Sequence, residues 1–117
     1  MADVRFTNSH GSRVFVAYMR LDHDCGFCGD PWDVRGWVVL DPGETETRPN
    51  DTGNRWFYYY AEGEDGSVWA GPFPAEVRQA RFDKCACLGV LQGGVNPYHE
   101  VGMRQLDLDR FGGVTFT

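Results

Sequence analysis

The stretch Arg55-Trp56-Phe57-Tyr58-Tyr59-Tyr60-Ala61-Glu62 decides the fold class of this chain. Five consecutive aromatic side chains favour the pleated surface of a β-strand over a helix. Successive side chains of a strand point to opposite faces of a sheet, and both faces of this stretch are apolar. We therefore predict that residues 55–62 form the central strand of a sheet.

Outward from this stretch, hydrophobic side chains recur with the period of strands, and Gly, Pro, Asn and Asp stand between the segments. The further predicted strands are residues 4–7, 14–21, 32–40, 44–48, 68–70, 100–109 and 114–117. Turn residues at 8–12 predict a hairpin between the first two of these segments. The only helix candidate, residues 75–83, is too short and too poorly patterned for more than a single turn.

These segments predict an all-β fold for residues 1–117, a single-domain antiparallel β-sandwich or small barrel of about seven to eight short strands. Composition agrees, because 42 % apolar and 15 % aromatic residues can supply a packed interior. No repeat, low-complexity run or domain boundary interrupts the pattern.

Charge and hydropathy exclude several classes of function. The formal net charge is −6, and the arginines are scattered among acidic residues, so we expect no nucleic-acid partner. No stretch approaches the roughly 20 apolar residues of a membrane helix, so we expect no transmembrane segment. The N-terminus lacks the apolar core of a signal peptide, which predicts a cytoplasmic location, with leaderless export left open.

Three blocks of sequence resemble a bacterial family known only as domain of unknown function ten thirty-six. They are Asn8 with residues 14–18 (Val-Phe-Val-Ala-Tyr), residues 35–44 (Arg-Gly-Trp-Val-Val-Leu-Asp-Pro-Gly-Glu), and residues 58–62 (Tyr-Tyr-Tyr-Ala-Glu) with residues 69–71 (Trp-Ala-Gly). The resemblance covers about residues 4–73 and implies a small β-rich bacterial protein, with little implied about activity. The chain departs from the family at Ser9, Thr45 and Pro74, where relatives tend to carry cysteines.

The four cysteines form the clearest candidate site. Cys25-Gly26-Phe27-Cys28 has the spacing of a metal knuckle, and Cys85-Ala86-Cys87 is a second, closer pair. Together they could hold a structural zinc ion through four thiolates. Alternatively they form disulfides, of which four cysteines permit three connectivities, or stay as free thiols. A reducing cytosol favours zinc, and an exported protein favours disulfides.

The other polar groups near this loop are weaker candidates for a functional site. A thioredoxin-like role is disfavoured, because Asp24 and Asp30 flank the first pair and negative charge raises a thiol pKa. His23 is an alternative metal ligand but is more typical of a solvated loop. Asp22 and Asp33 complete an acidic group that lacks the spacing of a calcium loop. We interpret these acidic residues as part of a solvent-exposed loop.

No catalytic motif is present in the sequence. We find no Gly-x-Ser-x-Gly, no Cys-His signature and no Gly-rich phosphate loop, so we expect that the protein is not an enzyme.

Aromatic residues supply the candidate binding surface. One face of the central strand would stay exposed if a single sheet covered it, and large exposed apolar patches usually meet partners. The candidate residues for this surface are Trp56, Tyr58, Tyr60, Trp37 and Trp69.

These observations predict a non-catalytic binding or self-assembly module, stabilised by the four-cysteine site, whose partner is itself or another protein. The alternative is a metal-active or redox-active four-cysteine domain. A third hypothesis is a membrane-surface or glycan-binding β-sandwich that contacts a lipid headgroup or a sugar through aromatic side chains.

Overall fold

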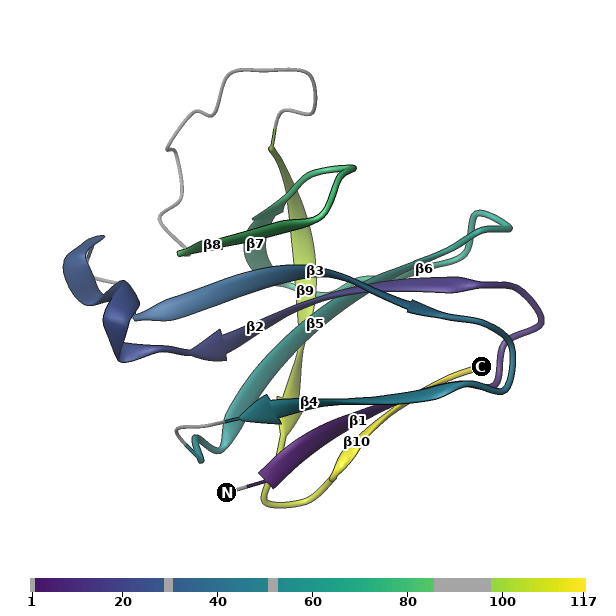
Figure 1. Cartoon of the computed structure of the whole chain (residues 1–117), viewed down its shortest axis with the longest axis horizontal. Coiled ribbons are helices and arrows are strands. Elements are labelled where there is room, and N and C mark those ends of the chain that lie inside the picture. Colours follow the sequence, from purple (N-terminus) through teal and green to yellow (C-terminus); the bar gives the residue numbers. More distant parts are fainter. Residues whose placement is uncertain (1, 29–30, 51–52, 86–97) are drawn as a thin grey trace.

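The computed structural model describes residues 2–28, 31–50, 53–85 and 98–117, with the side chains of residues 2, 26–28 and 84 excepted. Within this part of the chain it contains ten β-strands and one short 3-10 helix, η1 (His23–Cys28), in two sheets (Figure 1). The strands are β1 (Ala2–Asn8), β2 (Val14–Leu21), β3 (Trp32–Leu40), β4 (Thr45–Asn50), β5 (Trp56–Gly63), β6 (Val68–Trp69), β7 (Phe73–Val77), β8 (Phe82–Cys85), β9 (His99–Asp107) and β10 (Gly113–Phe116). The predicted all-β class is confirmed. The described helix η1 has neither the length nor the apolar character to cross a membrane.

The smaller sheet has the strand order β10-β1-β4, and the larger sheet has the order β7-β9-β5-β2-β3-β8, with β6 paired to β5. The aromatic strand β5 therefore lies in the middle of the larger sheet, as predicted. Tyr59 stands opposite Tyr18 of β2, and Phe57 stands opposite Leu106 of β9.

A first hydrophobic core fills the space between the two sheets. It is built from alternate positions of the facing strands, because these positions share one side of the pleat. We call it the inter-sheet core, and its buried residues are Val4, Phe6, Val14, Val16, Tyr18, Val38, Leu40, Phe57, Tyr59, Ala61, Leu106 and Phe116.

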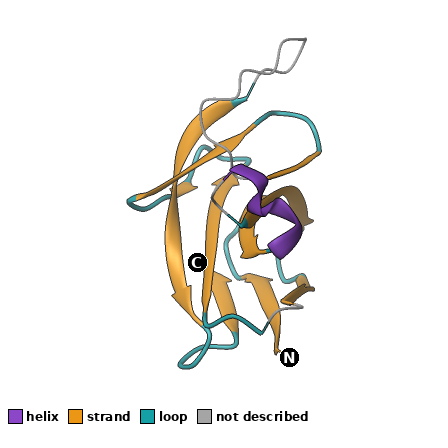
Figure 2. Cartoon of the chain, turned by 90° about the vertical axis from the view of Figure 1, so that its left-hand side faces the viewer, coloured by secondary structure: helices purple, strands orange, loops and turns teal. Residues whose placement is uncertain are grey.

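A second core lies on the opposite face of the larger sheet. This sheet curls, as the edge-on view shows (Figure 2), so that β7 approaches β3 and the curl encloses apolar side chains. We call it the curl core, and its buried residues are Ala17, Met19, Val34, Tyr60, Ala75, Val77, Phe82 and Met103. The central strands are consequently covered on both faces.

The expected hairpin between residues 4–7 and 14–21 is wrong. β1 pairs in parallel with β10 and antiparallel with β4, and the chain then crosses to the other sheet before β2 begins. The fully buried side chain of Asn8 holds this crossing. Its amide nitrogen donates to the carbonyls of Ser12 and Leu40, and its oxygen accepts from the His10 amide.

The expected helical turn at residues 75–83 is also wrong, because the segment contains the end of β7 and the start of β8. In β7, Ala75 and Val77 are buried while Pro74 and Glu76 face outward, which is the period of a strand. Pro74 is compatible with this strand because β7 lies at the edge of the sheet.

Candidate functional site

The first cysteine of the knuckle is paired across the fold. Cys25 of η1 forms a disulfide with Cys85 at the end of β8, 60 residues later, with their Cα atoms 5.3 Å apart. This pair realises one of the alternatives that the spacing left open. The side chain of Cys28 and all of Cys87 lie outside the described residues. Zinc binding by four thiolates stays a prediction for the reduced protein.

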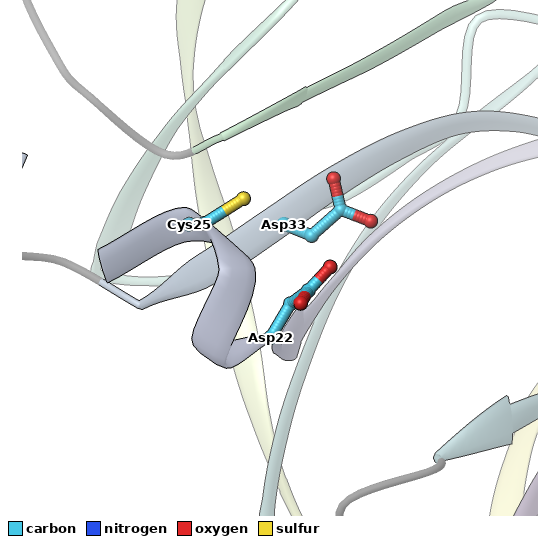
Figure 3. A group of neighbouring side chains, drawn as sticks. All are labelled: Asp22, Cys25 and Asp33. Atoms are coloured by element: carbon cyan, nitrogen blue, oxygen red, sulfur yellow. The ribbon is translucent and has the colours of Figure 1, made fainter. Parts of the chain in front are cut away.

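Asp22, Cys25 and Asp33 come together at this corner, with ligand atoms within 4.8 Å of one another (Figure 3). A sulfur in a disulfide is not a thiolate, so only the two carboxylates could serve a cation in this state. Asp33 is already engaged, because it accepts a hydrogen bond of 2.6 Å from Nε of Arg35. The corner is therefore a structural junction between η1, β3 and β8.

Asp33 differs from the solvent-exposed loop residue that we expected. It lies in β3 and is 3 % exposed. Its burial, and then the neighbouring Asp83 carboxyl, raise the pKa of Asp33 to about 6, although Arg35 acts in the opposite direction. Loss of hydration disfavours the carboxylate more than the arginine stabilises it. Near neutral pH this acid lies close to its titration range.

A cleft of about 430 Å³ opens beside this junction. It lies where β3, the edge strand β8 and the residue before β8 face β4 of the smaller sheet. The residues that line it are Tyr18, Arg35, Gly36, Trp37, Val38, Arg48, Pro49, Arg81, Phe82 and Asp83. We call it the edge cleft. Tyr18 and Val38 are buried members of the inter-sheet core, so the cleft reaches down to that core.

Three arginines and a single acid line the edge cleft. Arg35 is held between Asp33 and Asp83, the latter at 3.4 Å. Arg48 of β4 donates to the Thr47 carbonyl and lies 3.5 Å from Glu46. These contacts restrict where the guanidinium groups can point.

The loop before β8 is held as well. The guanidinium of Arg78 donates two hydrogen bonds, of 3.2 and 2.7 Å, to the carbonyl of Arg81. Nearby, Phe82 packs directly over Gly36, and a Cβ at Gly36 would overlap the Phe82 ring. Glycine is thus required where the wall of the cleft crosses β3.

Tyr18 forms the floor of the edge cleft, and its pKa depends on the charges around it. Arg35, Arg48 and Arg20 favour its ionised form, and Asp33 is the charge that opposes them. Burial outweighs these charges and raises the pKa of Tyr18 above its ordinary value. The phenol therefore stays protonated and can donate a hydrogen bond at neutral pH.

The exposed aromatic face that we expected does not form, because the curl core covers it. Tyr60 is buried, and Tyr58 packs against the rings of Trp32 and Phe73. The large hydrophobic side chains that are exposed in the described part of the chain are Val39, Val68 and Phe111.

The remaining three candidates for this face are half-buried. Trp69 packs against Phe116, and Trp56 lies under the guanidinium of Arg55. Trp37 lies in the wall of the edge cleft, and its indole nitrogen donates to the Arg78 carbonyl.

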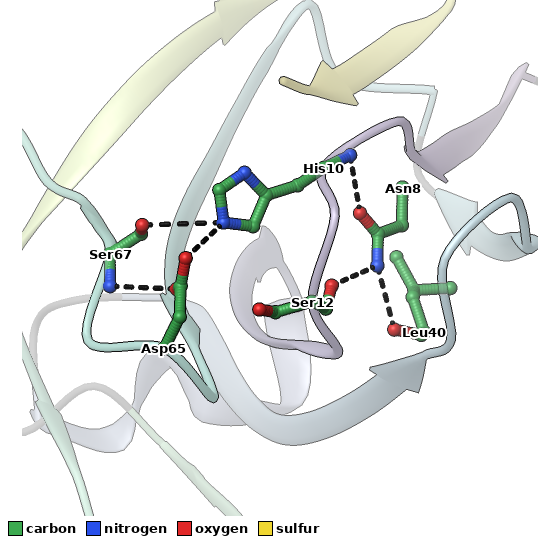
Figure 4. A network of polar contacts seen from close by, with 6 residues as sticks. All are labelled: Asn8, His10, Ser12, Leu40, Asp65 and Ser67. Atoms are coloured by element: carbon green, nitrogen blue, oxygen red, sulfur yellow. Dashed lines mark hydrogen bonds and ion pairs between the residues drawn. The ribbon is translucent and has the colours of Figure 1, made fainter.

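His10, Asp65 and Ser67 form a polar cluster beside the Asn8 crossing (Figure 4). Nε2 of His10 lies 2.8 Å from Asp65 and 3.3 Å from the Ser67 hydroxyl. A catalytic triad needs the acid and the nucleophile on different ring nitrogens, because the base must pass a proton between them. Both contacts here use the same nitrogen, so the cluster ties a turn and is not a triad.

The sequence did not single out Arg35, Arg48 and Arg81. They are 13 and 33 residues apart along the chain and each has acidic neighbours, so they read as scattered charges. The sequence of β4, Thr-Glu-Thr-Arg-Pro-Asn, has no apolar alternation, and only the structure shows that Glu46, Arg48 and Asn50 are more buried than the residues between them. The position of Arg48 beside the cleft was therefore not predictable from local pattern.

Comparison with known proteins found no matching family model, no similar curated protein and no similar solved structure. The resemblance to family ten thirty-six therefore stays a prediction.

Proposed function

We propose that this protein is a non-catalytic binding module that holds its ligand in the edge cleft. The observation that carries the proposal is the convergence of Arg35, Arg48 and Arg81 on a cleft whose floor is the buried Tyr18. Binding sites are typically concave, with apolar walls and a few convergent polar groups, and this cleft is within their usual range of volume.

Two other hollows are weaker candidates. One of about 500 Å³ lies on the outer face of the smaller sheet and is lined by solvent-facing residues such as Asp3, Thr7 and Thr47. Another of about 190 Å³ lies beside Phe15 and Gln79. The first has no aromatic wall, and the second is too small to enclose a drug-sized ligand.

The test is a fragment screen by two-dimensional NMR on the isotopically labelled protein, with a library that contains charged and neutral ring compounds. We expect hits to shift the amide signals of Tyr18, Val38 and Arg48 together with the indole signal of Trp37. The matched reporter is Trp69, which is half-buried but lies away from the cleft and should not respond. A screen whose hits all map elsewhere, or that yields none, contradicts the proposal.

A second candidate function is self-association through strand edges. β10 and β4 each have a single neighbour in the described part of the smaller sheet, and an edge strand can pair with another chain. Sedimentation at micromolar concentration would give a dimer or larger assembly under this hypothesis. A monomer at every concentration would exclude it and leave the cleft proposal untouched.

A further inference from the structure

We infer that the ligand of the edge cleft is an organic oxyanion, a ring compound that carries a carboxylate or a phosphate group. This inference rests on the proposed function, because it names the class of ligand for the same site. It is carried by the charge, the fixed geometry and the aromatic walls of the cleft.

The charge of the cleft is opposite to that of the chain. The protein has 17 acidic against 11 basic residues, yet the cleft is lined by three arginines and one aspartate, Asp83. A second acid, Asp33, lies behind Arg35, and Glu46 lies beside Arg48. The lining side chains themselves carry a formal charge of +2, three arginines against Asp83, while Asp33 and Glu46 just outside the lining offset this excess.

The arginines are positioned before any ligand arrives. Nε of Arg35 is fixed on Asp33, and Nη1 of Arg48 is fixed on the Thr47 carbonyl. A guanidinium carries five N–H donors in a planar fork that matches a carboxylate or a phosphate, and a fork fixed in advance loses less entropy on binding. Arg81 has an exposed side chain at the mouth. It can close on the anion from the solvent side.

The floor and the walls indicate the rest of the ligand. The protonated Tyr18 hydroxyl is a donor to an anionic oxygen, and the positive field of Arg35 and Arg48 at this position favours negative charge. The exposed lining is mainly polar, with Phe82 and Trp37 as its aromatic part, and aromatic side chains pack favourably against another ring. An inorganic anion would leave these walls unused, which favours a ring compound.

The experiment compares matched ring compounds by NMR titration and calorimetry on the full chain. The probes are benzoate, phenyl phosphate, neutral benzyl alcohol and inorganic phosphate. We expect benzoate or phenyl phosphate to bind at least about tenfold more tightly than benzyl alcohol, since charge-assisted hydrogen bonds to arginine are strong. Added NaCl should weaken this binding. The better of the two anions identifies the preferred head group.

Two substitutions test the role of the arginines, and one serves as the control. Arg48→Gln and Arg81→Gln should each weaken the preferred anion about tenfold while leaving benzyl alcohol unchanged. Arg81 is exposed, so its replacement cannot fail through loss of the fold. The control Arg13→Gln removes an exposed, ion-paired arginine that does not line the cleft and should change neither affinity.

Each result of these titrations tests a separate part of the proposal. Equal affinity for benzyl alcohol and the two ring anions, with shifts in the cleft, overturns the oxyanion inference and leaves the binding module standing. Binding of inorganic phosphate as tightly as phenyl phosphate overturns the part that concerns the ring. Absence of any binding in the cleft overturns the inference and, together with an empty fragment screen, the proposed function.

Discussion

The inter-sheet core and the curl core are closed by different means. The inter-sheet core consists mainly of Phe, Val and Leu side chains from the long strands of both sheets, most of them fully buried. The curl core includes two methionines and Tyr60, has half-buried tryptophans at its margin, and depends on the short strands β7 and β8. The disulfide between Cys25 and Cys85 fastens β8, whose ladder with β3 has four paired positions.

The difference shows how one domain combines two kinds of stabilisation. Burial of apolar area is sufficient where long strands face each other, because each buried side chain contributes in proportion to its area. A four-residue edge strand makes few ladder contacts, so a covalent link contributes more there. The edge cleft lies where these two regions meet, and its wall on the side of β8 belongs to the fastened region.

The largest effect is expected from opening the inter-sheet core. Phe57→Ala should lower the free energy of unfolding by about 3 to 5 kcal/mol, through lost burial and the cavity left behind. Phe82→Ala in the curl core should cost less, because Phe82 lies near the margin and its surroundings can relax. Chemical denaturation measures both changes. Equal losses for the two variants would contradict the distinction between the cores.

An intermediate effect is expected from removing the link at the curl core. The double variant Cys25→Ala with Cys85→Ala should lose roughly 2 to 4 kcal/mol, because the unfolded chain gains the entropy of an open loop. Amide hydrogen exchange should accelerate in β8 and stay slow in β1 and β4. If exchange accelerates equally in all three strands, the link stabilises the whole domain and not the curl alone.

The smallest effect concerns pH at the junction of the two regions. The raised pKa of Asp33 means that the native state holds this proton more tightly than the unfolded chain, between the ordinary value of 3.8 and about 6. The contribution of Asp33 to stability should therefore fall as pH rises through this window, whereas Asp65 and Asp107, whose pKa values are lowered, contribute with the opposite sign. Asp33→Asn removes the titration and should flatten this part of the stability profile, measured as the melting temperature from about pH 4 to about pH 7.

The control for this variant is Asp3→Asn, which replaces an exposed carboxylate on β1 and should keep the wild-type profile. Identical profiles for wild type and Asp33→Asn through the same window would contradict the raised pKa of Asp33.

The cysteine pair also bears on location. Disulfides persist mainly in oxidising compartments, so the link between Cys25 and Cys85 weighs against the cytoplasmic location that we expected. The location stays a prediction. Free-thiol counting on protein isolated under non-reducing conditions would resolve it.

Much of the fold was predictable from local pattern. The aromatic run of β5, the apolar alternation of β2 and β3, and the strands that became β4, β9 and β10 were all visible, because strand periodicity is a local property of the chain. The site was far less predictable. Four of the five aromatic residues assigned to a binding surface are packed within the fold away from the edge cleft, and only Trp37 reaches it.

The sequence by itself determined that β5 is a central strand with two apolar faces, because the aromatic residues that show this are contiguous. Only the tertiary structure decided what covers its two faces. One face is covered because the larger sheet curls and brings β7 and β8 over Tyr60. The other is covered because the crossing at Asn8 places β1 in a different sheet. Arg35 and Arg48 lie close together because of this arrangement. Their proximity depends on how two sheet edges meet and not on their spacing along the chain.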